Sequence, residues 1–118
     1  VPHDLWGYDL ASPPVLFDYT NEAGKTVAAV GQASKTGWFY IHDRLTGELL
    51  RKSDAFVPQK NMFAKATFEG ETLYPGILGG SNWSPVSLDQ GKQLAFVSGI
   101  PTTVKQGKCY GKPNRVLV

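Results

Sequence analysis

The sequence predicts an all-β fold built from short strands and many turns. Runs rich in β-branched and aromatic residues, such as residues 27–32 and 38–42, alternate with segments of turn-forming residues. The 13 glycines and 8 prolines are spread between these runs, as short strands with many turns require. Hydrophobic residues make up 42% of the chain and aromatic residues 12%, more than a disordered segment carries. The 118 residues are therefore enough for one domain with a modest core.

The first half of the chain predicts one four-stranded antiparallel set. Its strands are expected at residues 14–19, 25–32, 38–42 and 48–52. The turn-forming segment 34–37 separates the second strand from the third and carries Lys35, whose ammonium a rigid scaffold could aim at a ligand. The segment 43–47 supplies a hairpin turn, with Gly47 placed to adopt a positive φ.

The second half predicts the beginning of another set. Strands are expected at residues 84–88 and 93–98, and residues 53–81 form the long connection between the two sets. Residues 105–115 are basic and rich in glycine, which is typical of a frayed tail. The sequence therefore contains one complete set of strands and part of a second.

Charge and cysteine content exclude several classes of protein. The net charge is +2 and the basic residues are scattered, which indicates a solvated surface rather than a nucleic-acid patch. No apolar run approaches the ~20 residues of a membrane helix. Cys109 is the one cysteine, so an internal disulfide and a cysteine metal cluster are both excluded. The carboxylates show no calcium-loop spacing, and we assign no metal site.

Three segments carry motifs of a known family. Residues 3–9 read HDLWGYD, residues 34–37 and 43–48 read SKTG and DRLTGE, and residues 75–83 read PGILGGSNW. They resemble the His-Asp-x-Trp-Asp-x-Asp segment, the Lys-x-Gly loop with its Asp-Arg-x-Thr-Gly-Glu hairpin, and the Pro-Gly-x-x-Gly-Gly-x-Asn-Trp segment of the PQQ-dependent quinoprotein dehydrogenases. The three motifs occur in family order, and the resemblance spans residues 3–103.

The resemblance implies a partial β-propeller. The family's catalytic domain closes eight four-stranded antiparallel blades into a ring, and the strands expected here make about one and a half of these blades. We expect one blade at residues 13–52, a connection at 53–81, part of the next blade at 82–104 and a tail at 105–118. We interpret the chain as an excised or remnant piece of a larger enzyme.

Lys35 is the first candidate for a cofactor contact. In the family, the Lys of the matching Lys-x-Gly loop contacts the quinone of PQQ. A fixed ammonium near the quinone oxygens would stabilise the negative charge that they gain on reduction. The alternative is a solvated loop lysine that precedes a turn.

Asn82 is the second candidate, and Trp83 the third. The family's matching Asn faces the cofactor, and an amide suits both a quinone oxygen and a substrate hydroxyl. The alternative for Asn82 is that it holds its own turn. Trp83 either lines the substrate entry or packs between blades. Lys35 and Asn82 are 47 residues apart, near the spacing of one blade, so adjacent blades could present them side by side.

The remaining polar and aromatic residues of the motifs are assigned structural roles. Trp6 and Trp38 are expected to dock adjacent sheets. His3 and Asp4 resemble a general-base pair, but neighbouring residues on a strand face opposite ways, so we assign no catalytic residue. Asp4 and Asp9 are expected to bond backbone donors or an Arg, and Gly7 departs from the family's usual Asp.

The resemblance implies a segment of a PQQ-dependent dehydrogenase that oxidises an alcohol, glucose or another polyol and passes the electrons to the quinone. Calcium accompanies PQQ in such enzymes. The expected location is the periplasm or the periplasmic side of the inner membrane. In isolation the chain is expected to be inactive and to self-associate, or to join the remaining blades, through exposed strand edges. The alternative function is a non-catalytic β module for binding or assembly.

Overall fold

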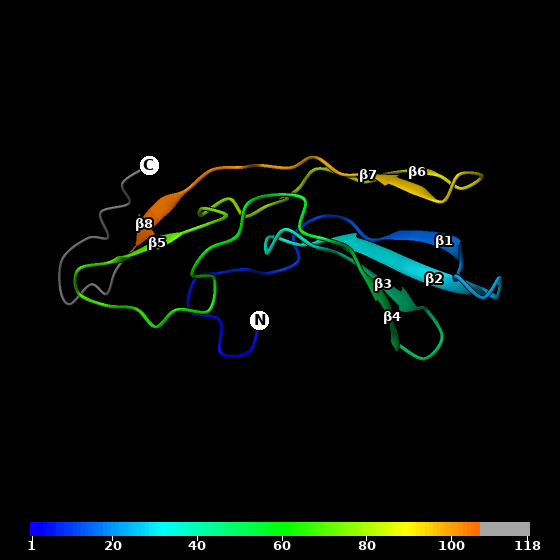
Figure 1. Cartoon of the computed structure of the whole chain (residues 1–118), viewed down its shortest axis with the longest axis horizontal. Helices are drawn as coiled ribbons and strands as arrows, with labels where there is room; N and C mark the ends of the chain where they lie inside the picture. Colours follow the sequence, from blue (N-terminus) through cyan, green and yellow to red (C-terminus); the bar gives the residue numbers. More distant parts are fainter. Residues whose placement is uncertain (107–118) are drawn as a thin grey trace.

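A computed structural model describes residues 1–106 and shows an extended, open arrangement of strands (Figure 1). The largest sheet has four antiparallel strands in the order β1-β2-β3-β4. The strands are β1 (Val15–Thr20), β2 (Thr26–Ala33), β3 (Phe39–Asp43) and β4 (Leu49–Lys52). Each one lies within one residue of the strand predicted from the sequence. The predicted all-β fold and its complete four-stranded set are therefore confirmed.

Tight turns join neighbouring strands of this sheet. In the β3–β4 turn, the carboxylate of Asp43 accepts hydrogen bonds from the backbone N–H groups of Leu45 (2.7 Å) and Thr46 (3.0 Å). These bonds hold the pKa of Asp43 below its usual range. Gly47 closes the turn with a φ of 78°, the positive value predicted from the sequence.

Two smaller sheets follow, and one of them differs from the prediction. The hairpin of β6 (Ser87–Asp89) and β7 (Leu94–Phe96) falls where two strands were expected. However, β5 (Glu71–Leu73) lies inside the stretch expected to be only a connection, and it pairs with β8 (Val104–Gln106). Most of the predicted tail, with Cys109, lies outside the described residues.

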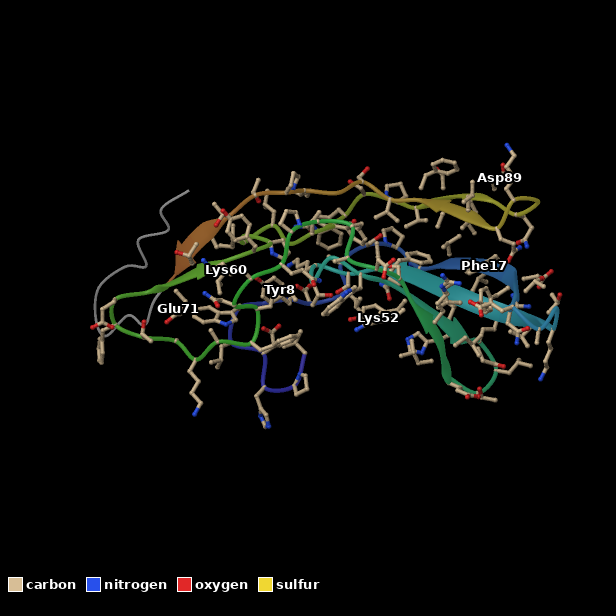
Figure 2. The ribbon with its side chains drawn as sticks, viewed as in Figure 1. Tyr8, Phe17, Lys52, Lys60, Glu71 and Asp89 are labelled. Carbon is tan, nitrogen blue, oxygen red and sulfur yellow. The ribbon has the colours of Figure 1, made fainter. Side chains whose placement is uncertain are left out.

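The core gathers the N-terminal segment and the long connection. Trp6, Tyr8, Met62, Leu73 and Val104 form one buried cluster, with Trp38 and Ala66 packed against it. The indole of Trp6 donates a hydrogen bond to the carbonyl of Ala64 (3.0 Å), and the Tyr8 hydroxyl donates one to the carbonyl of Pro75 (2.6 Å). Figure 2 shows Tyr8 at the centre of the molecule. Trp6 and Trp38 thus have packing roles, as expected.

Two glutamines fasten the β6–β7 hairpin to the free edge of β1. Gln90 accepts a hydrogen bond from the backbone N–H of Asp18 (3.2 Å) and donates one to the Asp18 carbonyl (2.6 Å). Gln93 accepts a bond from the backbone N–H of Thr20 (3.1 Å). The two side-chain amides occupy backbone groups that another strand would otherwise pair with.

Between this hairpin and the four-stranded sheet lies a cleft of about 640 Å³. Phe17 lines it from the sheet and Asp89 from the hairpin (Figure 2).

Among residues 1–106 there is no helix with the length and apolar character needed to span a membrane.

Candidate functional site

The loop between β2 and β3 is a rigid turn that carries Lys35. The N–H of Gly37 donates to the carbonyl of Ser34 (3.0 Å), and Gly37 has a φ of 91°. The Ser34 hydroxyl accepts hydrogen bonds from both the backbone N–H (3.1 Å) and the hydroxyl (2.8 Å) of Thr36. Ser34 and Thr36 are both buried. The backbone of Lys35 is therefore fixed on either side by buried hydrogen bonds.

Two glycines of the third motif pack directly on this loop. The N–H of Gly80 donates to the carbonyl of Lys35 (2.6 Å). A Cβ added at Gly79 would overlap the Cβ and Cγ of Lys35, and one added at Gly80 would lie 2.6 Å from the Cα of Gly37. The close approach that glycine permits here is thus between two segments of the chain, and it brings the second and third motifs together.

Asn82 follows these glycines, and only one of the two polar atoms of its side-chain amide makes a hydrogen bond within residues 1–106. Its Nδ2 donates to the carbonyl of Leu78 (3.0 Å), which holds the local turn. Its Oδ1 is buried and has no hydrogen-bond partner within residues 1–106, and the same is true of the hydroxyl of Ser81. Buried polar atoms are normally paired. Two neighbouring residues therefore offer oxygens that could accept a hydrogen bond from a ligand.

The head of the Lys35 side chain is held from the N-terminal segment. Its Nζ lies 2.5 Å from Oδ1 of Asp9 and 3.3 Å from the carbonyl oxygen of Gly7. The side chain of Lys35 is 17% exposed, and that of Asp9 is 64% exposed. The hydrogen bond from Lys35 holds the pKa of Asp9 below its usual range. All three motifs therefore meet at Lys35.

The other sequence-based candidates lie elsewhere or behave differently. The side chain of Trp83 is 78% exposed. Asp4 accepts hydrogen bonds from the backbone N–H groups of Trp6 (2.9 Å) and Gly7 (3.2 Å), as predicted. The argument that placed His3 and Asp4 on a strand was wrong, because neither residue belongs to a strand and His3 has a φ of 51°.

The prediction for Asp9 missed its main contact. A backbone donor or an Arg was expected, and the main partner is the Lys35 ammonium; a backbone hydrogen bond within Asp9 contributes less to its lowered pKa. The signal in the sequence was weak, because 26 residues separate the two side chains. Gly7, where the family's usual residue is Asp, contributes its carbonyl oxygen, and a Cβ at this position would meet nothing within 4 Å.

The arrangement combines one ammonium with unpaired oxygens. An ammonium has three N–H donors. Two acceptors, the carboxylate of Asp9 and the carbonyl oxygen of Gly7, lie beside the ammonium of Lys35. The oxygen of Asn82 accepts, so it suits a hydroxyl or another donor. The ammonium, in turn, suits a ligand with electron-rich oxygens. No group of three or more His, Cys, Asp or Glu within residues 1–106 could hold a metal ion.

Comparison with known proteins decides the family. Residues 1–61, more than half of the chain, match the family model described as "PQQ: Glucose/ethanol/alcohol dehydrogenase, beta-propeller domain". The chain belongs to this family. It is 29% identical over 118 aligned residues to a quinoprotein ethanol dehydrogenase of Pseudomonas putida, covering 81% of this chain and 19% of that protein. It is 44% identical over 52 residues to the quinate/shikimate dehydrogenase (quinone) of Acinetobacter baylyi, covering 44% of this chain and 6% of that protein.

A solved structure of the quinoprotein family shares the fold. The quinohemoprotein alcohol dehydrogenase ADHIIG of Pseudomonas putida HK5 superposes with a TM-score of 0.82 at 21% identity, covering all of this chain and 21% of that chain. The fold is therefore a partial β-propeller, as the sequence predicted. The chain spans about a fifth of the length of the curated relatives that it matches most fully.

Proposed function

We propose that this quinoprotein chain supplies part of the PQQ site of a dehydrogenase that oxidises an alcohol, glucose or another polyol. The observation that carries the proposal is the contact of the Lys35 loop with Gly80, two residues before the unpaired oxygen of Asn82. This backbone contact brings together the two segments that carry the ammonium and the hydrogen-bond acceptor. Family membership supports the cofactor, and relatives named as ethanol, glucose and quinate dehydrogenases support the substrate class.

PQQ, when bound, supplies the two-electron acceptor. The residues of this chain bind the cofactor and the substrate and polarise their reacting groups. The ammonium of Lys35 would hold a quinone oxygen through its remaining N–H and would stabilise negative charge there, more strongly in the transition state than in the ground state. Asn82 orients a hydroxyl through its free oxygen. Trp83 covers the approach to the cofactor with its exposed indole.

Calcium is proposed as the accompanying cation. Its ligands would be carboxylate and amide oxygens together with PQQ itself. We assign none of the residues of this chain to it. We propose the periplasm, or the periplasmic side of the inner membrane, as the location, on the basis of the family resemblance.

Strand edges are the proposed contact with other parts of the propeller or with a second copy of the chain. The β6–β7 hairpin has two strands where a blade has four. Its Leu94 and Phe96 are 48% and 60% exposed. Such a surface favours association with further strands.

An activity assay of the full-length protein tests the proposed function. The protein would be reconstituted with PQQ and calcium, then assayed with an artificial electron acceptor against ethanol, glucose, quinate and longer polyols. We expect turnover with at least one substrate, and none when PQQ is omitted. PQQ binding without turnover on any substrate of these classes would contradict the proposal.

The second candidate function is a non-catalytic module for binding or assembly. The observation that favours it is the exposure of Trp83, since an exposed aromatic ring offers contact area for a sugar or a protein. The same assay separates the two candidates. A dehydrogenase turns over with PQQ, whereas a binding module retains its partner without PQQ and shows no turnover.

A further inference from the structure

The ammonium of Lys35 is held by a part of the chain that the proposed cofactor contacts do not include. Two acceptors, Oδ1 of Asp9 at 2.5 Å and the carbonyl oxygen of Gly7 at 3.3 Å, lie on the segment before β1. A lysine ammonium has three N–H groups. These two contacts account for two of the groups and leave one for a ligand.

The base of the side chain is fixed from a different direction. The Lys35 carbonyl accepts the hydrogen bond from Gly80, and the backbone at Gly79 leaves no room for a side chain beside the Cβ of Lys35. The lysine is thus clamped at its backbone by the third motif and at its nitrogen by the first. A long, flexible side chain that would otherwise sample many rotamers is held in one arrangement.

We propose that Asp9 is a positioning residue for the cofactor site. Its carboxylate holds the Lys35 ammonium so that one N–H is left for a quinone oxygen. The inference rests on the proposed function of Lys35 and assigns a role to a residue outside the proposed cofactor contacts. Asp9 acts through Lys35 and is not itself a catalytic residue.

A purely structural role for Asp9 predicts different behaviour. The side chain of Asp9 is 64% exposed, and an exposed ion pair contributes little to the stability of a fold. Its removal should therefore leave the fold intact. The effect should appear where the ammonium acts, in the reactivity of its nitrogen and in turnover.

The first test uses the full-length protein loaded with PQQ. Asp9→Asn should lower kcat on the order of tenfold, because misplacing a catalytic group costs rate without unfolding the protein. Asp9→Glu keeps the carboxylate that pairs with the ammonium and should recover most of the lost turnover.

The matched control is Asp18→Asn. Asp18 is an exposed carboxylate on β1 whose hydrogen bonds with the hairpin use its backbone. This variant should leave kcat unchanged. An Asp9→Asn variant that behaves like Asp18→Asn would overturn the inference.

The second test needs no cofactor. Lysine acylation of the PQQ-free protein, mapped by mass spectrometry, would compare Lys35 with the exposed turn residue Lys25 as an internal reference. Asp9→Asn should raise the acylation rate of Lys35 several-fold, because the nitrogen loses its charge-assisted hydrogen bond to the carboxylate and becomes freer to react. The rate at Lys25 should stay the same, which shows that both samples meet the same reagent conditions. An unchanged rate at Lys35 would contradict the inference.

Different results would contradict the cofactor role of Lys35 and the positioning role of Asp9. Full turnover in Lys35→Ala would overturn the cofactor role of Lys35 and, with it, the role of Asp9 in turnover. Loss of turnover in Lys35→Ala, together with wild-type rates and acylation in Asp9→Asn, would overturn the role of Asp9 alone.

Discussion

At the scale of single residues, Lys35 carries the charge that this chain contributes to the proposed site. Its side chain is only 17% exposed, so the ammonium acts where water screens it weakly. Charge that develops on an anionic oxygen beside it would be stabilised without any rearrangement of solvent. An ammonium on a fully exposed surface would stabilise such a charge much less.

The first prediction concerns this charge. Lys35→Ala in the full-length protein should cost on the order of 2.7–4 kcal/mol in turnover, comparable to the loss of one preorganised donor to an oxyanion. Lys35→Arg should also be poor, because a planar guanidinium does not replace a compact ammonium. Steady-state kinetics at saturating PQQ measure both effects. Wild-type turnover in the alanine variant would mean that Lys35 is an ordinary loop residue.

Sequence reasoning reached the motif residues of this site but not all of their contacts. Lys35 and Asn82 were predicted to lie near each other from the spacing of their motifs, and the Gly80–Lys35 hydrogen bond joins the two segments. The Lys35–Asp9 pair was not predicted, because Asp9 precedes β1 on a segment without regular structure. Nothing in local periodicity indicates where such a segment folds back.

The second prediction concerns Tyr8 and alkaline pH. Burial, with a smaller contribution from the charge of Asp4, raises the pKa of Tyr8 from 10.0 to about 12. As the pH rises, Tyr8 therefore loses its proton at a lower pH in the unfolded state than in the folded state. The stability that Tyr8 contributes is intact below pH 10 and falls as the pH rises toward 12. Denaturant titrations of wild type and Tyr8→Phe, compared from pH 8 to pH 11.5, would measure this.

The difference between the two proteins isolates the tyrosine. At neutral pH, Tyr8→Phe should be the less stable by about 1–3 kcal/mol, because the buried carbonyl of Pro75 loses its donor. This difference should shrink above pH 10. A difference that stays constant over the whole range would contradict this prediction. It would show that Tyr8 loses its proton at the same pH in the folded and the unfolded state.

At the scale of elements, the contact between the β2–β3 loop and residues 79–80 joins the four-stranded sheet to the segment that leads to the β6–β7 hairpin. The four strands of the first sheet were predicted to within a residue, because each contains an apolar or β-branched run bounded by turn residues. The pair β5–β8 was missed. Each of its strands has three residues and pairs with residues 31 to 35 positions away along the chain, so neither run shows a recognisable period.

The third prediction tests the contact between the two segments. Gly79 and Gly24 have nearly the same φ, 76° and 77°, but only Gly79 has a neighbour, Lys35, where a Cβ would stand. Both alanine variants carry the strain of a positive φ. Gly79→Ala should be less stable than Gly24→Ala by about 1–3 kcal/mol, the usual cost of overpacking. Equal losses of stability, measured by thermal unfolding, would mean that the close packing on Lys35 is absent.

At the scale of the whole molecule, the chain is an open piece of a propeller. Its principal extents are 53 × 24 × 20 Å, and large apolar side chains such as Leu16 (62%) and Phe96 (60%) are exposed. Closed propellers leave few strand edges free. A single open segment has both unpaired edges and uncovered apolar faces.

The fourth prediction concerns the chain of 118 residues on its own. It should form dimers or larger oligomers at micromolar concentration, because association covers its apolar faces and free edges. It should also show no dehydrogenase activity with PQQ, calcium and any sugar or alcohol. Light scattering and a dye-linked assay measure the two properties. A stable, cooperatively unfolding monomer would contradict the first, and PQQ-dependent turnover the second.

Equilibrium binding of PQQ to the full-length protein tests the central claim most directly. Titrations followed by the absorbance of the quinone would compare wild type, Lys35→Ala and the control Lys25→Ala, which removes an exposed lysine from the β1–β2 turn. We predict that wild type and Lys25→Ala bind PQQ with equal affinity, and that Lys35→Ala binds at least tenfold more weakly, a loss of about 1.4 kcal/mol or more. Equal affinity in all three proteins, or no binding of PQQ to any of them, would contradict the assignment of this chain to the cofactor site.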